Sequence, residues 1–505
     1  MNKKRGKLKF TFVYVDFEYV ITQKGMKKDE PGGWYNEGIA QLAAIVESEG
    51  WDVSLIHLTD PVSKEEFLKL LRVHRPDVLG FSVRTGVRVY NKKLIGWADH
   101  ATDATILVGS YHPTLWPDKV IKWPGVNAIC LGEGEKALKQ FLNNYSEGKS
   151  ISKIGSLWVK DGNGKIHKNP VQPLVVDLDE LPLPKFDIFD FSRLIASQNK
   201  VPIVVLTRGC AYNCTYCWNN YVRNLYPNKQ CYVRYRSPKN CIKYCKGVMK
   251  VYPETKSFRF LDDLWPFYND WFENFSKLYD KKINLPFECN LRANLLNEKI
   301  IKRLKEIQCF GIYFGVESGN EYIRNKILKR NMTEQTLVDA FLTCKKYGIR
   351  THSFNIVGIP HENMKTVLDT VKLNAKLEPT DMFTPIFFPY AGTELHDIAI
   401  KEGFWDPKAK MHPYVNIQMP DFTRDQIRFA SLYAKLYIRL YQFVFKAHDI
   451  FRKPFEKVLD FLWLFPYWPF KFLNWLMYNY RKFENWLKAF IKKNFFWLYL
   501  QLRGY

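Results

Sequence analysis

Short apolar runs alternate with amphipathic helical stretches from residue 7 to about residue 400. A strand followed by a helix and a further strand forms a parallel sheet that helices cover. This order fits a doubly wound, flavodoxin-like α/β domain in residues 7–145, and such domains bind ligands at the carboxyl ends of their strands. The predicted strands are 8–15, 52–58, 77–83, 104–109 and 126–131, and the predicted helices are 34–49 and 64–74.

A connector follows at residues 151–199, where Pro182 and Pro184 disfavour helix. The alternation then resumes, and six βα units predict a partial or complete barrel with functional residues at the strand ends. Its predicted strands are 201–207, 257–262, 285–290, 311–316, 351–357 and 382–388. The expected domains are therefore 7–150, a linker at 151–199, a barrel at 200–395, a helical extension at 396–450 and a tail at 451–505.

The charge of the chain requires an explanation. Its 505 residues include 75 Lys or Arg and 51 Asp or Glu, which gives a net charge of +24. Such a surface favours nucleic acid, an anionic membrane or an anionic substrate as a partner. Ten cysteines in so long a chain do not form a small disulfide scaffold, and the apolar run 10–15 is too short for a signal peptide. A reducing, cytoplasmic compartment fits these features.

The tail, residues 451–505, is predicted to be helical and carries 20 aromatic residues, ten Lys or Arg and three Asp or Glu. Phe472, Leu476, Tyr480, Phe483 and Leu487 recur at helical spacing with basic residues between them, a pattern typical of a helix that lies in a membrane interface. A helical cap packed on the barrel is one alternative. A nucleic-acid-binding segment is another, although no recognised module accompanies it. The longest uncharged apolar stretch, 461–470, contains two prolines and is too short to span a bilayer.

Three cysteines follow the predicted strand 201–207 closely. Cys210, Cys214 and Cys217 have the spacing C-x3-C-x2-C. Three thiolates on one loop can ligate three irons of a [4Fe–4S] cluster and leave the fourth iron open for an exogenous ligand. Three ordinary buried cysteines, or half of a zinc site, are the alternatives.

This motif, with Tyr216 directly before its third cysteine, resembles that of the radical SAM superfamily. The resemblance covers about residues 200–395. It implies that the open iron chelates the amino and carboxylate groups of S-adenosylmethionine. It also implies that an external electron donor reduces the cluster, and that a 5′-deoxyadenosyl radical then takes hydrogen from an unactivated carbon.

Polar residues at the ends of the next four predicted strands match the same family in order, at 260–263, 290–292, 315–319 and 355–360. Because a charged group beside an apolar strand needs a partner when it is buried, a structural salt bridge is the alternative for each such residue. By resemblance, the S-adenosylmethionine contacts fall on Tyr216, Asp262, Arg292, Glu317, Ser318 and Gly358.

The segments 108–114 and 131–135 resemble loops of the cobalamin-binding domain that precedes many radical SAM domains. The loop after the first strand, 16–20, lacks the histidine of a D-x-H-x-x-G motif, so cobalamin would bind without histidine ligation. A degenerate flavodoxin-like domain for substrate binding or dimerisation is the alternative, and His112, which precedes a proline, can be a packing residue. By resemblance, the cobalamin contacts fall on Gly109, Ser110, His112, Gly132, Glu133 and Gly134.

These features predict a cobalamin-dependent radical SAM enzyme that C-methylates a hydrophobic small molecule, such as a lipid or an isoprenoid. Radical cyclisation, oxidation or carbon–carbon coupling on a lipid or tetrapyrrole is the alternative. A methylthiotransferase is disfavoured because the N-terminal domain has only Cys130 for a second cluster. A non-catalytic electron-transfer protein lacks support because the fourth cluster ligand is missing, and a nucleic-acid-modifying enzyme is the remaining rival. The enzyme is expected in the cytoplasm, where it can lie peripherally on the membrane.

Overall fold

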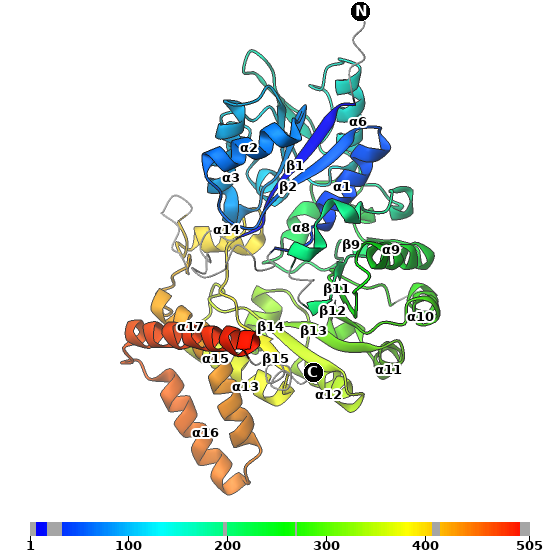
Figure 1. Ribbon diagram of the computed structural model, residues 1–505. Coiled ribbons are helices and arrows are strands. Elements are labelled where there is room, and N and C mark those ends of the chain that lie inside the picture. Colours follow the sequence, from blue (N-terminus) through cyan, green and yellow to red (C-terminus); the bar gives the residue numbers. More distant parts are fainter. Residues whose placement is uncertain (1–6, 18–32, 195–198, 268–269, 407–414, 495–505) are drawn as a thin grey trace, which may run out of the picture. The chain divides into compact units, whose positions relative to one another are not determined.

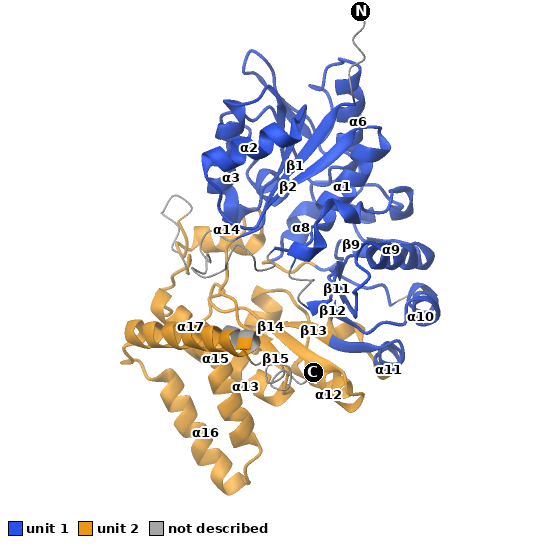
Figure 2. Ribbon diagram, in the orientation of Figure 1, with its two compact units in different colours: residues 1–212, 217–291, 299–311 blue, residues 213–216, 292–298, 312–505 orange. Residues whose placement is uncertain are grey.

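The computed structural model describes residues 7–17, 33–194, 199–267, 270–406 and 415–494 (Figure 1). The chain forms two compact units (Figure 2). Unit 1 comprises residues 1–212, 217–291 and 299–311, and unit 2 comprises residues 213–216, 292–298 and 312–505.

Unit 1 contains a seven-stranded sheet with the strand order β2-β1-β3-β4-β5-β6-β7. β1 to β5 run parallel, with Phe12 of β1 opposite Leu55 of β2 and Gly80 of β3, whereas β6 and β7 pair antiparallel. The order of the first five strands confirms the flavodoxin-like prediction. The strands are β1 (Lys9–Val15), β2 (Asp52–Leu58), β3 (Val78–Ser82), β4 (Thr105–Gly109), β5 (Ala128–Cys130), β6 (Leu157–Lys160) and β7 (Ile166–Lys168).

Helices pack on this sheet because a parallel sheet buries both of its faces. α2 packs beside α3 over a core that includes Val13, Leu79 and Phe81, and α1 packs beside α6 (Figure 1). The helices are α1 (Glu37–Ser48), α2 (Lys64–His74), α3 (Arg88–Asp99), α4 (Tyr111–Leu115), α5 (Pro117–Val120) and α6 (Glu135–Ser146).

Two features of this region differ from the sequence prediction. α1 begins at Glu37 rather than at residue 34, because the Asn36 side chain caps it by accepting a hydrogen bond from Ile39 N. β6 and β7 lie inside the predicted connector, where they form a hairpin that extends the sheet. Asp161 Oδ1 accepts from Lys165 N at 3.0 Å in this turn, so the Asp-Gly-Asn-Gly sequence was a hairpin signal that the proline-based interpretation missed.

The second main sheet has six strands in the order β15-β14-β13-β12-β11-β8, with β8 and β15 as its two edges. This open sheet confirms the partial barrel. The predicted strand 201–207 is two short strands, because Leu206 N and Thr207 N donate to Asp262 Oδ1 at 2.7 and 2.6 Å instead of to a strand. The strands are β8 (Ile203–Val204), β9 (Thr207–Arg208), β10 (Arg234–Tyr235), β11 (Phe258–Phe260), β12 (Phe287–Leu291), β13 (Cys309–Glu317), β14 (Arg350–Asn355) and β15 (Asp381–Phe383), with β9 and β10 paired as a separate ribbon.

The remaining helices follow these strands and then continue to the tail. The region from residue 420 is helical as predicted throughout most of its described residues, and residues 495–505 lie outside the described part. Among the described helices, none combines the length and the apolar character that crossing a bilayer requires. The helices are α8 (Trp218–Arg223), α9 (Pro238–Val251), α10 (Asp270–Lys282), α11 (Glu298–Glu306), α12 (Glu334–Lys346), α13 (Met364–Leu377), α14 (Glu394–Lys401), α15 (Arg424–Phe445), α16 (Asp449–Leu464) and α17 (Phe470–Asn494).

Candidate active site

A cavity of about 400 Å³ opens in unit 1 at the carboxyl ends of β3, β4 and β5. This is the edge at which doubly wound sheets bind their ligands. The residues of the cavity wall include five of the six predicted cobalamin contacts, namely Gly109, Ser110, Gly132, Glu133 and Gly134.

The same cavity borders the cysteine motif. Arg208 and Gly209, which directly precede Cys210, belong to its wall. Trp218 and Asn219, which come directly after the third cysteine of the motif, belong to it as well. The loops after β4 and β5 and both flanks of the cysteine motif therefore share one cavity.

Backbone geometry keeps one side of this cavity open. An added Cβ at Gly109 would meet only Cys130 Cβ, at 4.0 Å, so the backbone there is accessible to a ligand. Gly132 has a φ of +72°, and an added Cβ would lie 2.3 Å from the Tyr226 hydroxyl. Thr114 joins the two loops, since its hydroxyl donates to Ser110 O and accepts from Gly132 N. Because any side chain at position 132 would collide with the Tyr226 hydroxyl, only glycine allows the loop after β5 to approach Tyr226 this closely.

His112 does not line the cavity, contrary to the prediction that included it among the cobalamin contacts. Its ring packs against Trp123, with centroids 5.7 Å apart, and its Nδ1 lies 3.4 Å from the Thr85 hydroxyl. Burial lowers the pKa of His112 to about 4. The structure therefore supports the packing alternative.

A buried charge cluster forms one side of the cavity wall. Arg208 Nη1 lies 2.5 Å from Glu135 Oε1 and 3.4 Å from Glu133 Oε2, and its Nη2 lies 3.6 Å from Glu37 Oε1. Arg234 forms a bidentate pair with Glu133, at 3.0 and 2.5 Å. Three carboxylates therefore share two guanidinium groups, a fork geometry to which arginine is suited.

The members of this cluster differ in their electrostatics. Burial raises the pKa of Glu133, but hydrogen bonds and charge from Arg234 and Arg208 outweigh it, so that the pKa lies below its usual value. Burial holds the pKa of Glu37 above its usual value despite Arg208. Among the described residues, none donates a hydrogen bond to the buried Oε2 of Glu135. An acceptor in the wall of the cavity is thus available for a ligand's N–H or O–H group.

The cysteine motif occupies the segment between β9 and α8. Gly209, with a φ of +81°, makes the turn into it, and an added Cβ would lie 2.3 Å from Tyr232 O. Within the described residues, no three His, Cys, Asp or Glu side chains gather around a position that a single metal ion could occupy. Each cysteine of a [4Fe–4S] cluster ligates a different iron, so these thiols need not converge on one ion.

Unit 2 gathers three of the predicted residues, Tyr216, Arg292 and Glu317, near Cys214. Arg292 Nη1 and Arg330 Nη1 lie 3.5 and 3.7 Å from its Sγ, and both arginine side chains are buried. Tyr216 donates its hydroxyl hydrogen bond to Glu317 Oε1 at 2.8 Å and receives one from Arg330 at 3.2 Å. Two buried guanidinium groups therefore lie directly beside a sulfur of the cysteine motif.

Glu317 occupies a strained position at the end of β13, with a φ of +66°. Burial raises the pKa of its carboxyl, while the charges of Arg330 and the hydrogen bond from Tyr216 oppose this rise. Arg330 Nη1 lies 3.8 Å from Glu317 Oε1, and Arg330 also donates to Gly315 O. A buried carboxylate and two buried guanidinium groups thus stand in one small region.

Three other predicted residues have structural contacts instead. Asp262 accepts hydrogen bonds from the β8–β9 connection, and burial raises its pKa to about 6. The Ser318 hydroxyl lies 3.4 Å from that of Thr370 on α13. Gly358 has a φ of +84°, and its N–H donates to Glu362 Oε2 at 2.7 Å. These residues position the loops around the site.

The sequence interpretation did not single out Glu37, Arg208, Arg234, Tyr226 or Arg330 as functional. An arginine directly after the predicted apolar strand 201–207 was an available signal for Arg208. Glu37 and Arg234 join the site from distant parts of the chain, and no local pattern marks such a meeting.

Comparison with known proteins gives two domain matches. Residues 31–142 match the B12 binding domain, and residues 204–373 match the radical SAM superfamily. The chain is a radical SAM enzyme with a B12-binding domain. Its cofactors are a [4Fe–4S] cluster, S-adenosylmethionine and cobalamin. The electron-carrier alternative is therefore set aside.

This radical SAM enzyme is similar to known proteins over most of its length. It is 27% identical to an uncharacterized methyltransferase of Pyrococcus horikoshii, over 80% of this chain and 87% of the relative. It is 22% identical to an anaerobic magnesium-protoporphyrin IX monomethyl ester cyclase of Rubrivivax gelatinosus, over 72% of this chain and 67% of the relative.

A solved structure shares the fold. The radical S-adenosylmethionine methyltransferase TsrM from Kitasatospora setae, with cobalamin and a [4Fe–4S] cluster bound, superposes with a TM-score of 0.62 at 16% identity. The match covers 79% of this chain and 76% of that chain. The residues of the present chain fit these groups: the open backbone at Gly109 and the free acceptor on Glu135 suit an amide-bearing corrin, and three thiols on one loop suit the cluster.

Proposed function

We propose that this enzyme C-methylates an unactivated carbon of a hydrophobic substrate, such as a lipid or an isoprenoid. The cavity in unit 1 carries the proposal, because its wall combines the loops after β4 and β5 with both flanks of the cysteine motif. A cavity that borders both features suits a reaction in which two cofactors serve one substrate. The similarity to the Pyrococcus horikoshii methyltransferase supports methyl transfer.

The proposed roles follow from the groups each region offers. Cys210, Cys214 and Cys217 would ligate the cluster. Arg292 and Glu317, with Tyr216 holding Glu317, offer charges complementary to the carboxylate and amino groups of S-adenosylmethionine. Gly109, Ser110, Gly132, Glu133 and Gly134 would hold the corrin, while Asp262, Ser318 and Gly358 position the surrounding loops.

When bound, the cofactors supply a 5′-deoxyadenosyl radical and a transferable methyl group. The chain supplies orientation and shelter from water. Most of the cavity wall is apolar, with Phe10, Phe12 and Leu138 among its residues, and an apolar wall keeps water away from a radical.

Radical cyclisation, oxidation or carbon–carbon coupling on a lipid or tetrapyrrole is the second candidate. The similarity to the Rubrivivax gelatinosus cyclase favours it. The two candidates differ in product mass, since methylation adds carbon and hydrogen whereas an oxidative closure removes hydrogen.

We further propose that the enzyme works in the cytoplasm, on the surface of an anionic membrane, with an external electron donor. The net charge of +24 and the aromatic, basic tail support this location. The domain limits proposed from the sequence, 7–150, 151–199, 200–395, 396–450 and 451–505, are kept as part of this proposal.

The test is an anaerobic reconstitution with iron, sulfide, cobalamin, reductant and S-adenosylmethionine, with and without lipid extract. We expect 5′-deoxyadenosine and a methylated lipid from the wild type, and neither from a Cys210→Ala, Cys214→Ala, Cys217→Ala variant. Cys231→Ala, which changes a cysteine outside the motif, is the matched control and should keep both products. A lipid that has lost hydrogen would favour the cyclisation candidate, and 5′-deoxyadenosine from the triple variant would refute the assigned ligands.

A further inference from the structure

Large apolar side chains are exposed unusually densely between residues 450 and 490. More than half of the exposed large apolar side chains of the described chain lie in this stretch, which contains α16 and most of α17. Folded surfaces usually scatter such residues singly, and a dense patch marks a binding surface. The patch therefore needs a partner.

α16 packs on unit 2 through one face. Trp463 is fully buried and donates its indole N–H to Met364 O at 2.8 Å. Lys372 pairs with Glu456 at 2.9 Å and with Asp460 at 2.7 Å, so these two acidic side chains are turned inward and neutralised. The opposite side of the helix carries phenylalanines, and the side chains of Phe451, Phe455 and Phe461 are 56–63% exposed.

α17 is held in the same way. Asn474 is buried and donates to Asp425 O, Tyr433 donates to Leu473 O at 2.9 Å, and Arg481 donates to Leu432 O at 2.6 Å. Its opposite side carries aromatic rings that stack on one another, with Phe483 and Trp486 centroids 5.8 Å apart. Packing thus fixes both helices with their apolar sides outward, which disfavours the simple helical cap.

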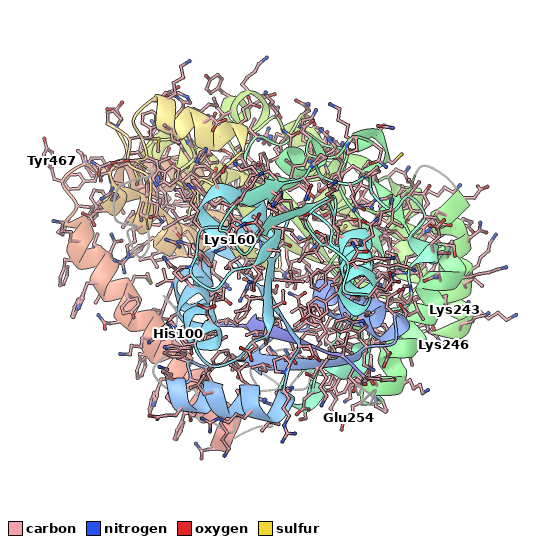
Figure 3. All side chains as sticks on the ribbon, turned by 90° about the horizontal axis from the view of Figure 1, so that it is seen from above. His100, Lys160, Lys243, Lys246, Glu254 and Tyr467 are labelled. Carbon is pink, nitrogen blue, oxygen red and sulfur yellow. The ribbon has the colours of Figure 1, made fainter. Side chains whose placement is uncertain are left out.

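The outer face is defined here by Phe451, Phe455, Phe461, Phe472, Phe483 and Trp486, each more than half exposed. Tyr467, in the turn between α16 and α17, is 83% exposed and lies at the outer edge of the view in Figure 3.

Cations accompany the outer face. Lys453 and Lys457 on α16 and Lys471 and Lys482 on α17 are exposed. Of the acidic residues on α16, Asp449 is exposed, whereas Glu456 and Asp460 pair with Lys372. An aromatic surface with lysines beside it is complementary to an anionic lipid bilayer, since Trp and Phe enter the interface while Lys meets the headgroups.

We infer that the outer face of α16 and α17 is the surface by which the enzyme binds an anionic lipid bilayer peripherally. The reason for such binding rests on the proposed function, because a hydrophobic substrate resides in a lipid bilayer. The helices lie in the interface without crossing it, in keeping with their length and charge.

The test is flotation of the full chain with vesicles of phosphatidylcholine alone or mixed with phosphatidylglycerol. We expect binding to the mixed vesicles and little binding to phosphatidylcholine. Lys453→Gln with Lys457→Gln should weaken binding about 30-fold at low salt. Phe455→Ser, Phe461→Ser and Trp486→Ser together should weaken it at least about tenfold. Val73→Ser with Val89→Ser removes two equally exposed apolar side chains elsewhere and should leave binding unchanged.

Two results would overturn the inference. One is wild-type protein that does not float with the vesicles that contain phosphatidylglycerol. The other is a dimer, detected by light scattering, that does not bind vesicles and that becomes monomeric in the Phe455→Ser, Phe461→Ser, Trp486→Ser variant. That result would assign the outer face to contact with a second copy of the chain. An assay of 5′-deoxyadenosine formation without vesicles tests the proposed function separately from membrane binding. Variants of the outer face should still form 5′-deoxyadenosine in that assay. Protein that floats but yields no 5′-deoxyadenosine would refute the proposed function and leave the membrane surface intact.

Discussion

Replacing Arg208 with glutamine tests whether the buried charge cluster is organised as described. The guanidinium lies 2.5 Å from Glu135 and 3.6 Å from Glu37, and the structure records no other ion pair for either carboxylate among the described residues. Glu133 keeps its bidentate partner Arg234. The substitution therefore leaves Glu37 and Glu135 without the ion-pair partner that the structure records for them.

Removing one partner of a buried ion pair costs about 3–5 kcal/mol, and we expect this range near pH 8 for Arg208→Gln. A carboxylate that has lost its cation has a raised pKa in the folded state, so the folded protein binds more protons than the unfolded chain. Stability of the variant should then recover as the pH falls, by up to about 1.4 kcal/mol per pH unit for each group.

The assay is urea unfolding of the cofactor-free protein from pH 5 to pH 8, followed by circular dichroism. Arg208→Gln combined with Glu135→Gln should regain part of the loss, which a double-mutant cycle measures. Lys277→Gln, which breaks the exposed pair between Lys277 and Glu273, is the control and should cost no more than about 1 kcal/mol. A loss for Arg208→Gln as small as the control, with no dependence on pH, would refute the reasoning.

Three other perturbations have clear expected outcomes. Gly132→Ala should weaken cobalamin binding, measured by absorbance titration, because its Cβ would lie 2.3 Å from a tyrosine hydroxyl in the cavity wall. Gly164→Ala has the same left-handed backbone but open space around it, so it should cost about 1 kcal/mol of stability and leave cobalamin affinity unchanged. Burial raises the pKa of Glu362 to about 8, so its favourable contribution is present at low pH and is lost as the pH rises from near 4.5 to 8. Glu362→Gln should remove that decline from the pH profile of the unfolding midpoint, and an unchanged profile would contradict the assignment. Tyr216→Phe should destabilise the protein by about 1–3 kcal/mol in urea unfolding, since it leaves the buried Glu317 carboxylate without its hydroxyl donor; a loss near zero would show that this hydrogen bond is not formed.

Local pattern was enough to predict the two α/β sheets and most of their strands. Alternating apolar runs and amphipathic helices allow few other arrangements, because each apolar face must be covered. The three cysteines were identifiable for a similar reason, since their spacing within one loop is itself the chemical requirement for a cluster.

The segment between the two sheets shows where local pattern fell short. Prolines near its end led to an extended connector, yet β6 and β7 form a hairpin that completes the first sheet. A short hairpin with few apolar residues gains its stability from the edge strand it pairs with, and that edge is supplied by the tertiary fold.

By itself, the sequence determined the architecture, the cysteine motif and the aromatic character of the tail, because these depend on residues close together in the chain. Only the tertiary structure decided that Glu37, Glu135 and Arg208 meet in one cavity wall, and that His112 lies outside it. It also decided which side of α16 and α17 faces outward. Contacts between residues that are distant in the sequence depend on how the whole unit packs. Burial at those contacts then shifts the pKa values of the ionisable groups.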